Sequence, residues 1–183
     1  YNSRSERIRS AKAFAGVTAV RTARHAVMCE IPFLRRKPVS ITIRSMRPGD
    51  ADALHRLLSD PEVMRYLEPP FDRAQSDDFL RRAGLPELPL VYAAEENGDF
   101  IGYVIYHAYD EQSVEIGWVL LPEYWGRGYA SALTERLIDR ARQEQKSVVI
   151  ECAPAQEATR RIAGKKGFRT CGSCDGLAVY RLP

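Results

Sequence analysis

The chain has 183 residues, of which 45% are hydrophobic and 28% are charged, and its formal net charge is +3. This length suits one ordinary domain with a hydrophobic core, with or without a tail, and the composition excludes a disordered chain. No stretch approaches the roughly 18 consecutive apolar residues of a membrane helix, and four cysteines are too few and too unevenly spaced for a small disulfide scaffold.

The positive charge is concentrated at the start of the chain. Residues 1–40 carry nine basic and two acidic side chains, whereas the remaining residues carry 18 basic and 22 acidic ones. We interpret residues 1–38 as a basic N-terminal extension or a cloning remnant, with an organellar transit peptide of similar composition as the alternative. The domain itself is predicted to span residues 39–183 and to be mildly acidic, so the net charge does not indicate nucleic-acid binding.

The first half of the predicted domain combines one strand with short helices. Alternating apolar and polar residues predict a strand over 41–46, and Asp50 is expected to cap the helix that follows. Leu54, Leu57 and Leu58 fall on one face of that helix. The remaining segments of this half are helices over 61–67 and 73–82, a stiff loop over 68–72 and a linker over 83–89.

The second half is predicted to form hairpins and then strands joined by helices. Asn97-Gly98 is a strong tight-turn signal between two strand-like segments. The apolar run 148–150 is typical of a buried central strand. The predicted elements are strands over 90–95, 100–106, 114–121 and 148–150, helices over 128–145 and 155–165, and a closing hairpin of 168–172 and 177–182. Together with the first half they make one mixed α/β domain rather than two.

The most informative segment is Leu120-Leu-Pro-Glu-Tyr-Trp-Gly-Arg-Gly-Tyr-Ala130. It leaves a strand and enters the long helix through two closely spaced glycines. A helix start exposes unpaired N–H groups and the positive end of the helix dipole, and glycines there let a phosphate approach the backbone. Arg127, between the glycines, can add a charge-assisted contact. The segment therefore predicts a phosphate site, with an ordinary glycine-rich turn as the alternative.

A dinucleotide-binding turn is the rival interpretation of these glycines. Gly126-Arg-Gly-Tyr-Ala-Ser131 nearly matches that fingerprint, and Glu151 ends the next strand, where a ribose-binding acid would sit. However, Ser131 replaces the third glycine, and antiparallel-looking strands precede the motif. A nucleoside-triphosphate loop is excluded because no Gly-Lys-Ser/Thr follows.

Residues 40–182 resemble the GNAT N-acetyltransferases, and in particular the branch of the ribosomal-protein alanine N-acetyltransferases. The acetyl-CoA signature of the superfamily, [Gln/Arg]-x-x-Gly-x-[Gly/Ala], maps onto Trp125-Gly-Arg-Gly-Tyr-Ala130, with Trp125 in the first position as is common in that branch. A second block, Thr159-Arg-Arg-Ile-Ala-Gly-Lys-Lys-Gly-Phe-Arg169, resembles its Ser-x-x-x-x-Glu-Lys-x-Gly-Phe segment. Two motifs in the right order and at the right separation make the resemblance specific.

The second block departs from the family pattern at several positions. Gln156 stands where the family has Asn, and Thr159 where it has Ser, although both retain hydrogen-bonding ability. Gly164 replaces the usual Glu. Ala163 occupies a position at which many GNAT enzymes carry a tyrosine general acid, so that role is vacant or has moved.

The resemblance implies a three-layer α/β fold in which helices flank a central mixed, mostly antiparallel sheet. It implies an acetyl-CoA-dependent N-acetyltransferase that moves an acetyl group to a primary amine by direct attack in a ternary complex. Acetyl-CoA is the implied co-substrate, without a metal, and the acceptor is a small-molecule amine or a protein N-terminus. No nucleic acid or membrane partner is expected, the cytoplasm is the expected location, and a homodimer is one option because dimers are common in the family.

Two other functions stay open at this stage. One is a non-catalytic, acyl-CoA-binding GNAT-like module, which the changes in the second block suggest. The other is an enzyme that binds a nicotinamide dinucleotide at the same glycine turn.

The resemblance also assigns residues to the cofactor and to the acceptor. Backbone N–H groups at the end of the strand would face the thioester, and the glycine turn would hold the phosphates. The expected cofactor-binding residues are Val119, Leu120, Trp125, Gly126, Arg127, Gly128, Tyr129, Ala130, Gln156 and Thr159. The expected substrate residues are Tyr66, Glu68, Phe71 and Asp72, on the loop that roofs the acceptor site in this family, and His107 at a strand end.

Acetyl transfer also needs a base for the ammonium and a proton for the departing thiolate. Glu115 is the candidate base, acting directly or through water, because it lies on the opposite face of its strand from Ile116; an exposed or salt-bridged glutamate is the alternative. Tyr124 is the candidate proton donor, with packing of its ring against the loop as the alternative. Cys171-Gly-Ser-Cys174 lacks the second pair of ligands that a zinc site needs, so no metal is expected.

Overall fold

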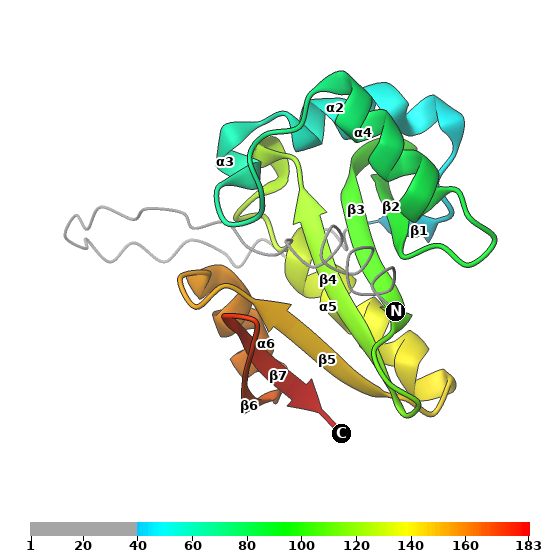
Figure 1. Cartoon of the computed structure of the whole chain (residues 1–183). Helices are drawn as coiled ribbons and strands as arrows, with labels where there is room; N and C mark the ends of the chain where they lie inside the picture. Colours follow the sequence, from blue (N-terminus) through cyan, green and yellow to red (C-terminus); the bar gives the residue numbers. More distant parts are fainter. Residues whose placement is uncertain (1–39) are drawn as a thin grey trace, which may run out of the picture.

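The structure is a computed structural model that describes residues 40–183. The predictions for residues 1–38 therefore lie outside the described residues. In chain order the strands and helices are β1 Ile41–Arg44, α2 Ala51–Leu58, α3 Pro61–Met64, α4 Arg73–Phe79, β2 Val91–Glu96, β3 Asp99–Ala108, β4 Ser113–Leu120, α5 Tyr129–Gln143, β5 Ser147–Cys152, α6 Glu157–Lys165, β6 Arg169–Cys174 and β7 Leu177–Leu182 (Figure 1).

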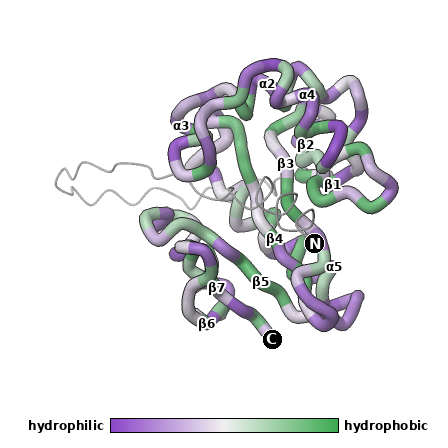
Figure 2. The backbone as a smooth tube through the Cα atoms, viewed as in Figure 1, coloured by the Kyte–Doolittle hydropathy of each residue, from purple (hydrophilic) through white to green (hydrophobic). Residues whose placement is uncertain are grey.

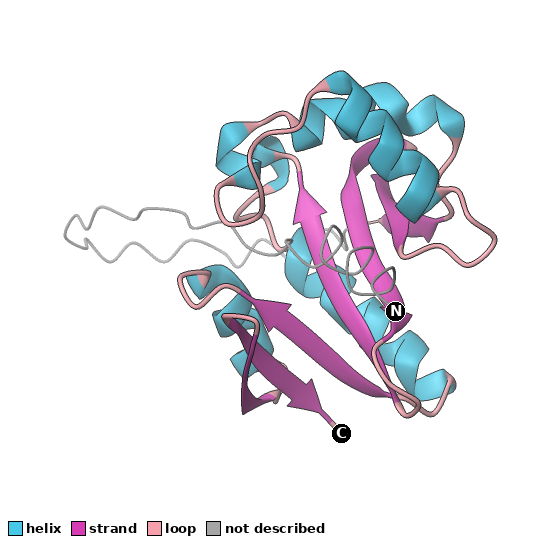
Figure 3. Cartoon of the chain, viewed as in Figure 1, coloured by secondary structure: helices cyan, strands magenta, loops and turns pink. Residues whose placement is uncertain are grey.

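One seven-stranded sheet in the order β1-β2-β3-β4-β5-β7-β6 runs through the described residues. Every neighbouring pair of strands is antiparallel except β4 and β5, which are parallel and are joined by α5. Helices cover both faces, with α2–α4 on one side and α5 and α6 on the other (Figure 3). The expected three-layer α/β fold with a mostly antiparallel sheet is confirmed.

Each face of the sheet carries its own apolar core. Leu133 and Leu137 of α5 are almost completely buried against β3–β5, as their spacing along one helical stripe predicts. Leu54 and Leu57 of α2 are buried with Phe79 of α4 on the opposite face. Hydrophobic residues accordingly line the central strands while the outer helices are largely hydrophilic (Figure 2). The buried sheet thus forms a rigid base for any site at its strand ends.

The two central strands pair only over a short length. The parallel register between β4 and β5 runs from Ser113↔Ser147 to Glu115↔Val149 and then stops. Beyond Glu115, β4 continues to Leu120 while β5 pairs with β7 on its other side, and Figure 1 shows β4 and β5 diverging. Among the described residues, this edge of β4 therefore has no strand partner over its second half.

Local turn signals were reliable guides to the structure. Asn97 and Gly98 both have positive φ, 53° and 92°, as a tight two-residue hairpin turn requires. They connect β2 to β3, which pair antiparallel, so the predicted hairpin is confirmed.

The predicted cap at Asp50 is wrong. The Asp50 carboxylate accepts hydrogen bonds at 2.7 Å from the Arg47 N–H and from both terminal nitrogens of Arg44, and it makes no side-chain bond to the N-terminus of α2. Arg44 also bonds Glu95 on β2. A bidentate contact to a guanidinium is stronger than a bond to a neutral N–H, so this carboxylate joins β1 to the rest of the domain instead.

Two helices end earlier than predicted. The helix from Pro61 stops at Met64, before the Pro-Pro pair of the following loop. The helix from Arg73 stops at Phe79 and continues as one π-helical turn over Leu80–Gly84. That turn brings Gly84 so close to the segment after β1 that a Cβ there would lie 2.7 Å from the Met46 sulfur.

Candidate functional site

The loop from β4 to α5 forms a left-handed turn at its two glycines. Gly126 has a φ of 69° and Gly128 a φ of 96°, values that are costly for residues with a Cβ. Gly128 is the N-cap residue of α5 and supplies no side-chain cap. A Cβ at Gly126 would meet nothing within 4 Å. The turn therefore leaves the first N–H groups of a fifteen-residue helix uncapped by a side chain, beside open space.

Arg127 is held at this turn by two aromatic rings. Its guanidinium carbon lies 5.9 Å from the centre of the Tyr124 ring and 5.7 Å from that of Tyr129. One terminal nitrogen also donates to the Glu123 carbonyl at 3.2 Å. The two rings meet edge to face, with their centres 5.4 Å apart. An exposed cation is thus kept beside the helix N-terminus, where an anion would be most stable.

Trp125 ties the turn to the end of β4. Its indole Nε1–H donates to the Leu120 carbonyl at 2.7 Å, and its ring packs against both apolar cores. Trp125, which replaces the Gln or Arg of the acetyl-CoA signature, therefore fixes the geometry of the loop.

Backbone hydrogen bonding decides which amides of β4 face its open edge. The Leu121 N–H donates to the Ile101 carbonyl on β3 at 3.0 Å. Direction alternates along an antiparallel ladder, so the Val119 N–H also points to β3. The N–H groups of Trp118 and Leu120 point the other way, to the side on which β5 diverges. Of the two residues expected to face a thioester arm, Leu120 presents its amide to that edge and Val119 does not.

Glu115 is buried next to His107 of the neighbouring strand. The two residues are directly paired across β3 and β4, and the His107 Nε2 lies 3.5 Å from a Glu115 oxygen. Glu115 is only 2% exposed, which excludes a solvent-exposed glutamate, whereas its contact with His107 matches the other alternative, a salt-bridged glutamate. The His107 Nδ1 lies 3.1 Å from the Ala108 carbonyl, an acceptor only, so Nδ1 carries a proton and Nε2 faces the carboxylate. The pair thus places an imidazole nitrogen beside a buried carboxylate oxygen.

A second buried carboxylate, Glu151, lies on the same face of the sheet. Glu115 pairs with Val149, and Glu151 is two residues further along β5, so its side chain points to the same side. The Tyr109 hydroxyl donates to Glu151 at 2.7 Å. Sequence reasoning considered Glu151 only as a ribose ligand and missed Tyr109. A glutamate at the end of an otherwise apolar strand was the available signal.

The two residues predicted to be catalytic lie at opposite ends of β4. Glu115 is near its beginning, and Tyr124 packs on Tyr129 after its end. At about 3.3 Å per residue, the five residues from Glu115 to Leu120 alone span about 17 Å. The structure therefore does not bring Glu115 and Tyr124 to one reacting atom.

Two of the expected substrate residues have structural contacts. Phe71 is 7% exposed and meets Phe79 edge to face, with ring centres 6.4 Å apart. The Asp72 carboxylate caps α4 by accepting the Gln75 N–H at 2.8 Å. Core packing and helix capping account for these two positions.

Tyr66 and Glu68 are the other two loop residues expected at the acceptor site. Tyr66 stacks under the Arg65 guanidinium at 5.5 Å and is partly exposed. Burial raises the pKa of Glu68. The pKa of Tyr103 on β3 is also raised, first by the burial of Tyr103 itself and then by the charge of Glu68. Glu68 thus places a carboxylate near the sheet face that also carries Glu115.

The second motif block is tightly packed at both expected cofactor residues. Gln156 is 1% exposed, and its side-chain oxygen accepts the Ala153 N–H at 2.8 Å. Thr159 is fully buried on α6. Gln156 therefore closes the loop between β5 and α6 with a bond of its own.

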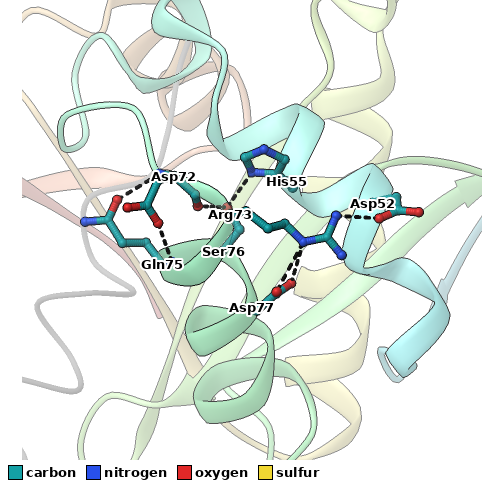
Figure 4. Close-up of polar contacts among 7 residues, drawn as sticks. All are labelled: Asp52, His55, Asp72, Arg73, Gln75, Ser76 and Asp77. Atoms are coloured by element: carbon teal, nitrogen blue, oxygen red, sulfur yellow. Dashed lines mark hydrogen bonds and ion pairs between the residues drawn. The ribbon is translucent and has the colours of Figure 1, made fainter.

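A serine and a histidine also meet between α2 and α4 (Figure 4). The His55 Nδ1 lies 3.0 Å from the Ser76 hydroxyl oxygen, and that hydroxyl donates to the Asp72 carbonyl at 2.9 Å. Because the serine proton is committed to the carbonyl, His55 donates to Ser76, the reverse of what a nucleophilic serine needs. Arg73, paired with Asp52 and Asp77, strengthens the same helix contact. This cluster is a packing contact.

The remaining chemistry-bearing groups indicate no further site. Within residues 40–183, no cluster of three or more His, Cys, Asp or Glu side chains could hold a metal, and no helix is long and apolar enough to cross a membrane. Burial raises the pKa of the Cys152 thiol to about 11, which disfavours a nucleophilic thiolate. Cys171 and Cys174 are exposed thiols on β6.

Comparison with known proteins decides the family. Residues 40–169 match the model described as an acetyltransferase (GNAT) domain. The chain belongs to the GNAT acetyltransferase family. The GNAT domain is 27% identical over 139 residues to the Bacillus subtilis (strain 168) protein named uncharacterized N-acetyltransferase YnaD, covering 72% of this chain and 81% of that protein.

Two solved structures share the fold of this GNAT domain. A GNAT-family acetyltransferase from Bacillus anthracis gives a TM-score of 0.66 at 24% identity, covering 77% of this chain and 92% of that one. Spermidine N-acetyltransferase from Vibrio cholerae, solved with CoA and spermine, gives 0.63 at 19% identity with the same coverages. By contrast, the one parallel strand pair among the described residues does not build the repeated βαβ units of a dinucleotide-binding fold.

Proposed function

We propose that this GNAT domain transfers an acetyl group from acetyl-CoA to a primary amine by direct attack in a ternary complex. The observation that carries the proposal is the layout of β4. A glycine turn with uncapped helix N–H groups lies at one end, a buried glutamate at the other, and an unpaired strand edge runs between them. This layout suits a cofactor whose phosphates and thioester lie at opposite ends of a long arm.

The residues at the turn fit the phosphates of that cofactor. The uncapped N–H groups of α5 and the left-handed Gly126 and Gly128 would bind the pyrophosphate, with Arg127 adding charge. The Leu120 N–H on the open edge would bind the pantetheine arm in the manner of an added strand. When bound, acetyl-CoA supplies the activated acetyl group. Everything else must come from the protein: holding the arm, positioning the amine and moving its protons.

Glu115 is the proposed base for the incoming ammonium. Its carboxylate lies where the sheet opens, and His107 at 3.5 Å can share the proton it gains. Glu68 and His107 would face the acceptor, and a carboxylate there favours a cationic amine. We expect a small-molecule amine or a protein N-terminus in the cytoplasm as the acceptor.

Two titrations test the cofactor assignment. Calorimetry with acetyl-CoA and with a nicotinamide dinucleotide should show binding of acetyl-CoA, and binding of the dinucleotide alone would refute the proposal. Thiol release is then measured with spermine, an aminoglycoside and a peptide that begins with alanine. Binding without thiol release on any of them would instead favour the acyl-CoA-binding module, an option that the buried Ala163 keeps open.

A matched pair of variants tests the base. Glu115→Gln should lower kcat/KM at neutral pH by about 100-fold or more and flatten its pH profile, because the amide cannot accept the proton. Glu87→Gln, on an exposed loop, is the control and should behave as the wild type. An unchanged pH profile in Glu115→Gln removes this residue from the mechanism.

A further inference from the structure

The proposed transfer requires a proton for the departing thiolate, and neither expected source is placed to give it. Ala163, where many family members carry a tyrosine, is fully buried and has no ionisable group. Tyr124 lies beyond the far end of β4 from Glu115. On the basis of the proposed function, we propose that Tyr109, positioned by Glu151, is the proton-carrying catalytic residue of the transfer site.

Tyr109 is fixed in the turn between β3 and β4. Its backbone N–H donates to the Ser113 carbonyl at 2.9 Å, which closes the turn. Its hydroxyl donates to Glu151 at 2.7 Å, and the Arg181 guanidinium lies 5.9 Å from the centre of its ring. Arg181 is itself bound to Asp110 at 3.0 Å. Contacts from two strands and from its own turn therefore hold the phenol against β5.

The phenol lies on the same side of the sheet as the proposed base. Glu115 and Glu151 project from neighbouring strands, on the face that β4 and β5 share where they begin to diverge. The titratable and charged groups that face Tyr109 come from four strands: Glu115 of β4, Glu151 of β5, Cys174 of β6 and Arg181 of β7. A base and a proton donor thus approach the place where the proposed thioester would end.

The acid–base behaviour of the phenol agrees with a proton carrier. Burial first, then the hydrogen bond to Glu151 and the charges around it, including that of Glu115, raise the pKa of Tyr109. The phenol is therefore protonated at neutral pH, and its phenolate would recover a proton at once. A raised pKa also makes the phenol a weaker acid than a free tyrosine, so transfer of its proton to the sulfur depends on the return of a proton from the nitrogen.

Two protons leave the ammonium in the proposed reaction: Glu115 takes the first and later releases it to water, and Tyr109 handles the second. Glu115 takes one proton from the ammonium, and the neutral nitrogen attacks the thioester carbon, so that the C–N bond forms and the carbonyl oxygen becomes an oxyanion. When the oxyanion collapses, the C–S bond breaks and the Tyr109 proton passes to the sulfur. The nitrogen, still carrying the extra proton that the amide must lose, returns it to the Tyr109 oxygen. Nitrogen and sulfur are bound to the same carbon until the C–S bond breaks, so one phenol oxygen can reach both.

The variant Tyr109→Phe tests this role, with Tyr106→Phe as its matched control. The Tyr106 hydroxyl makes an equivalent bond to the carboxylate of Glu144, also 2.7 Å long, but on the α5 face of the sheet. Tyr109→Phe should lower kcat by about 100-fold or more, while its Kd for acetyl-CoA by calorimetry and its KM for the amine change little. Tyr106→Phe should keep the wild-type kcat. Equal kcat values for the two variants would overturn the inference.

Glu151 is a positioning residue in this scheme, and its variants give a different readout. Glu151→Ala should lower kcat, whereas Glu151→Gln, which keeps a hydrogen-bond acceptor for the phenol, should restore most of it. In a Tyr109→Phe background, Glu151→Ala should cause no further loss, because the two residues act as one unit. Equal losses in Glu151→Ala and Glu151→Gln would overturn the positioning role.

Turnover by the wild type distinguishes a failure of the proposed function from a failure of the Tyr109 inference. No thiol release by the wild type with spermine, the aminoglycoside or the alanine peptide would overturn the proposed function, and this inference with it. Wild-type turnover with undiminished Tyr109→Phe would overturn the inference alone. If Tyr109→Phe does not fold, the Glu151 variants test the inference instead. A Glu151→Ala variant with the wild-type kcat and the wild-type melting curve would overturn it.

Discussion

Replacing Gly102 by alanine probes the contact between β3 and β4 at the end proposed to hold the cofactor arm. Gly102 has a φ of 150°, and a Cβ built on it would lie 2.0 Å from the Val119 carbonyl oxygen and 2.8 Å from the Leu120 Cα. Both are backbone atoms in a hydrogen-bonded ladder, so neither can rotate aside as a side chain would. The strands must move apart to accept the methyl group.

The expected cost follows from two contributions. Overpacking of a close contact costs about 1–3 kcal/mol, and an L-residue at positive φ adds about 1–2 kcal/mol. We therefore expect Gly102→Ala to lower the free energy of unfolding by about 3 kcal/mol. For a chain of this size, that corresponds to a fall in Tm of about 6–12 °C.

Gly164→Ala is the matched control, because the same substitution should have the opposite sign there. Gly164 lies on the exposed side of α6, and a Cβ on it meets nothing within 4 Å. Alanine in a helix is more favourable than glycine by about 0.5–1 kcal/mol. Urea unfolding followed by circular dichroism gives both values. The reasoning is refuted if Gly102→Ala is within about 1 kcal/mol of the wild type, or if Gly164→Ala loses as much as Gly102→Ala.

Two further predictions concern carboxylates with structural roles. Burial tends to raise the pKa of Asp50, but hydrogen bonds from Arg44 and Arg47 lower it more, so its stabilising contribution is present at pH 7 and is lost as the pH falls through that lowered value. Asp50→Asn should therefore cost about 2 kcal/mol at pH 7, and urea unfolding should show the difference shrinking below pH 3.8; a constant difference down to pH 2 would contradict this. Asp72→Ala should cost about 1 kcal/mol through loss of the α4 cap, and Asp72→Asn much less. Equal losses for the two Asp72 variants in the same assay would assign the effect to the charge rather than to the cap.

Features encoded within a few neighbouring residues were predictable from the sequence. Asn97-Gly98 fixes a hairpin turn by its own backbone preferences, and the apolar stripe of α5 identifies its buried face. The glycines at 126 and 128 likewise predicted a turn before a helix, and α5 begins directly after Gly128. In each case the physical cause lies within one turn or one element, so no knowledge of strand order is needed.

Contacts between distant segments were not predictable in this way. Tyr109 and Glu151 are 42 residues apart, and they meet only because β4 pairs in parallel with β5 at one particular register. The Asp50 carboxylate could cap a helix or bind a guanidinium, and Arg44 is held beside it partly by a bond to Glu95, 51 residues away on β2. Glu115 and Tyr124 were predicted separately as base and proton donor, and the strand predicted over 114–121 already lay between them, as β4 does in the structure.

The early end of the β4–β5 pairing has a consequence for how specificity can change. Recognition along the unpaired edge of β4 would use main-chain groups, which every residue type possesses, so it does not depend on which side chains the strand carries. If the proposed function holds, substitutions at Glu115 on this strand and at Glu68 on the loop above it would alter the acceptor without changing how the main chain binds the donor. In such a sheet, recognition of the donor by main-chain groups and recognition of the acceptor by side chains would be separated along a single strand.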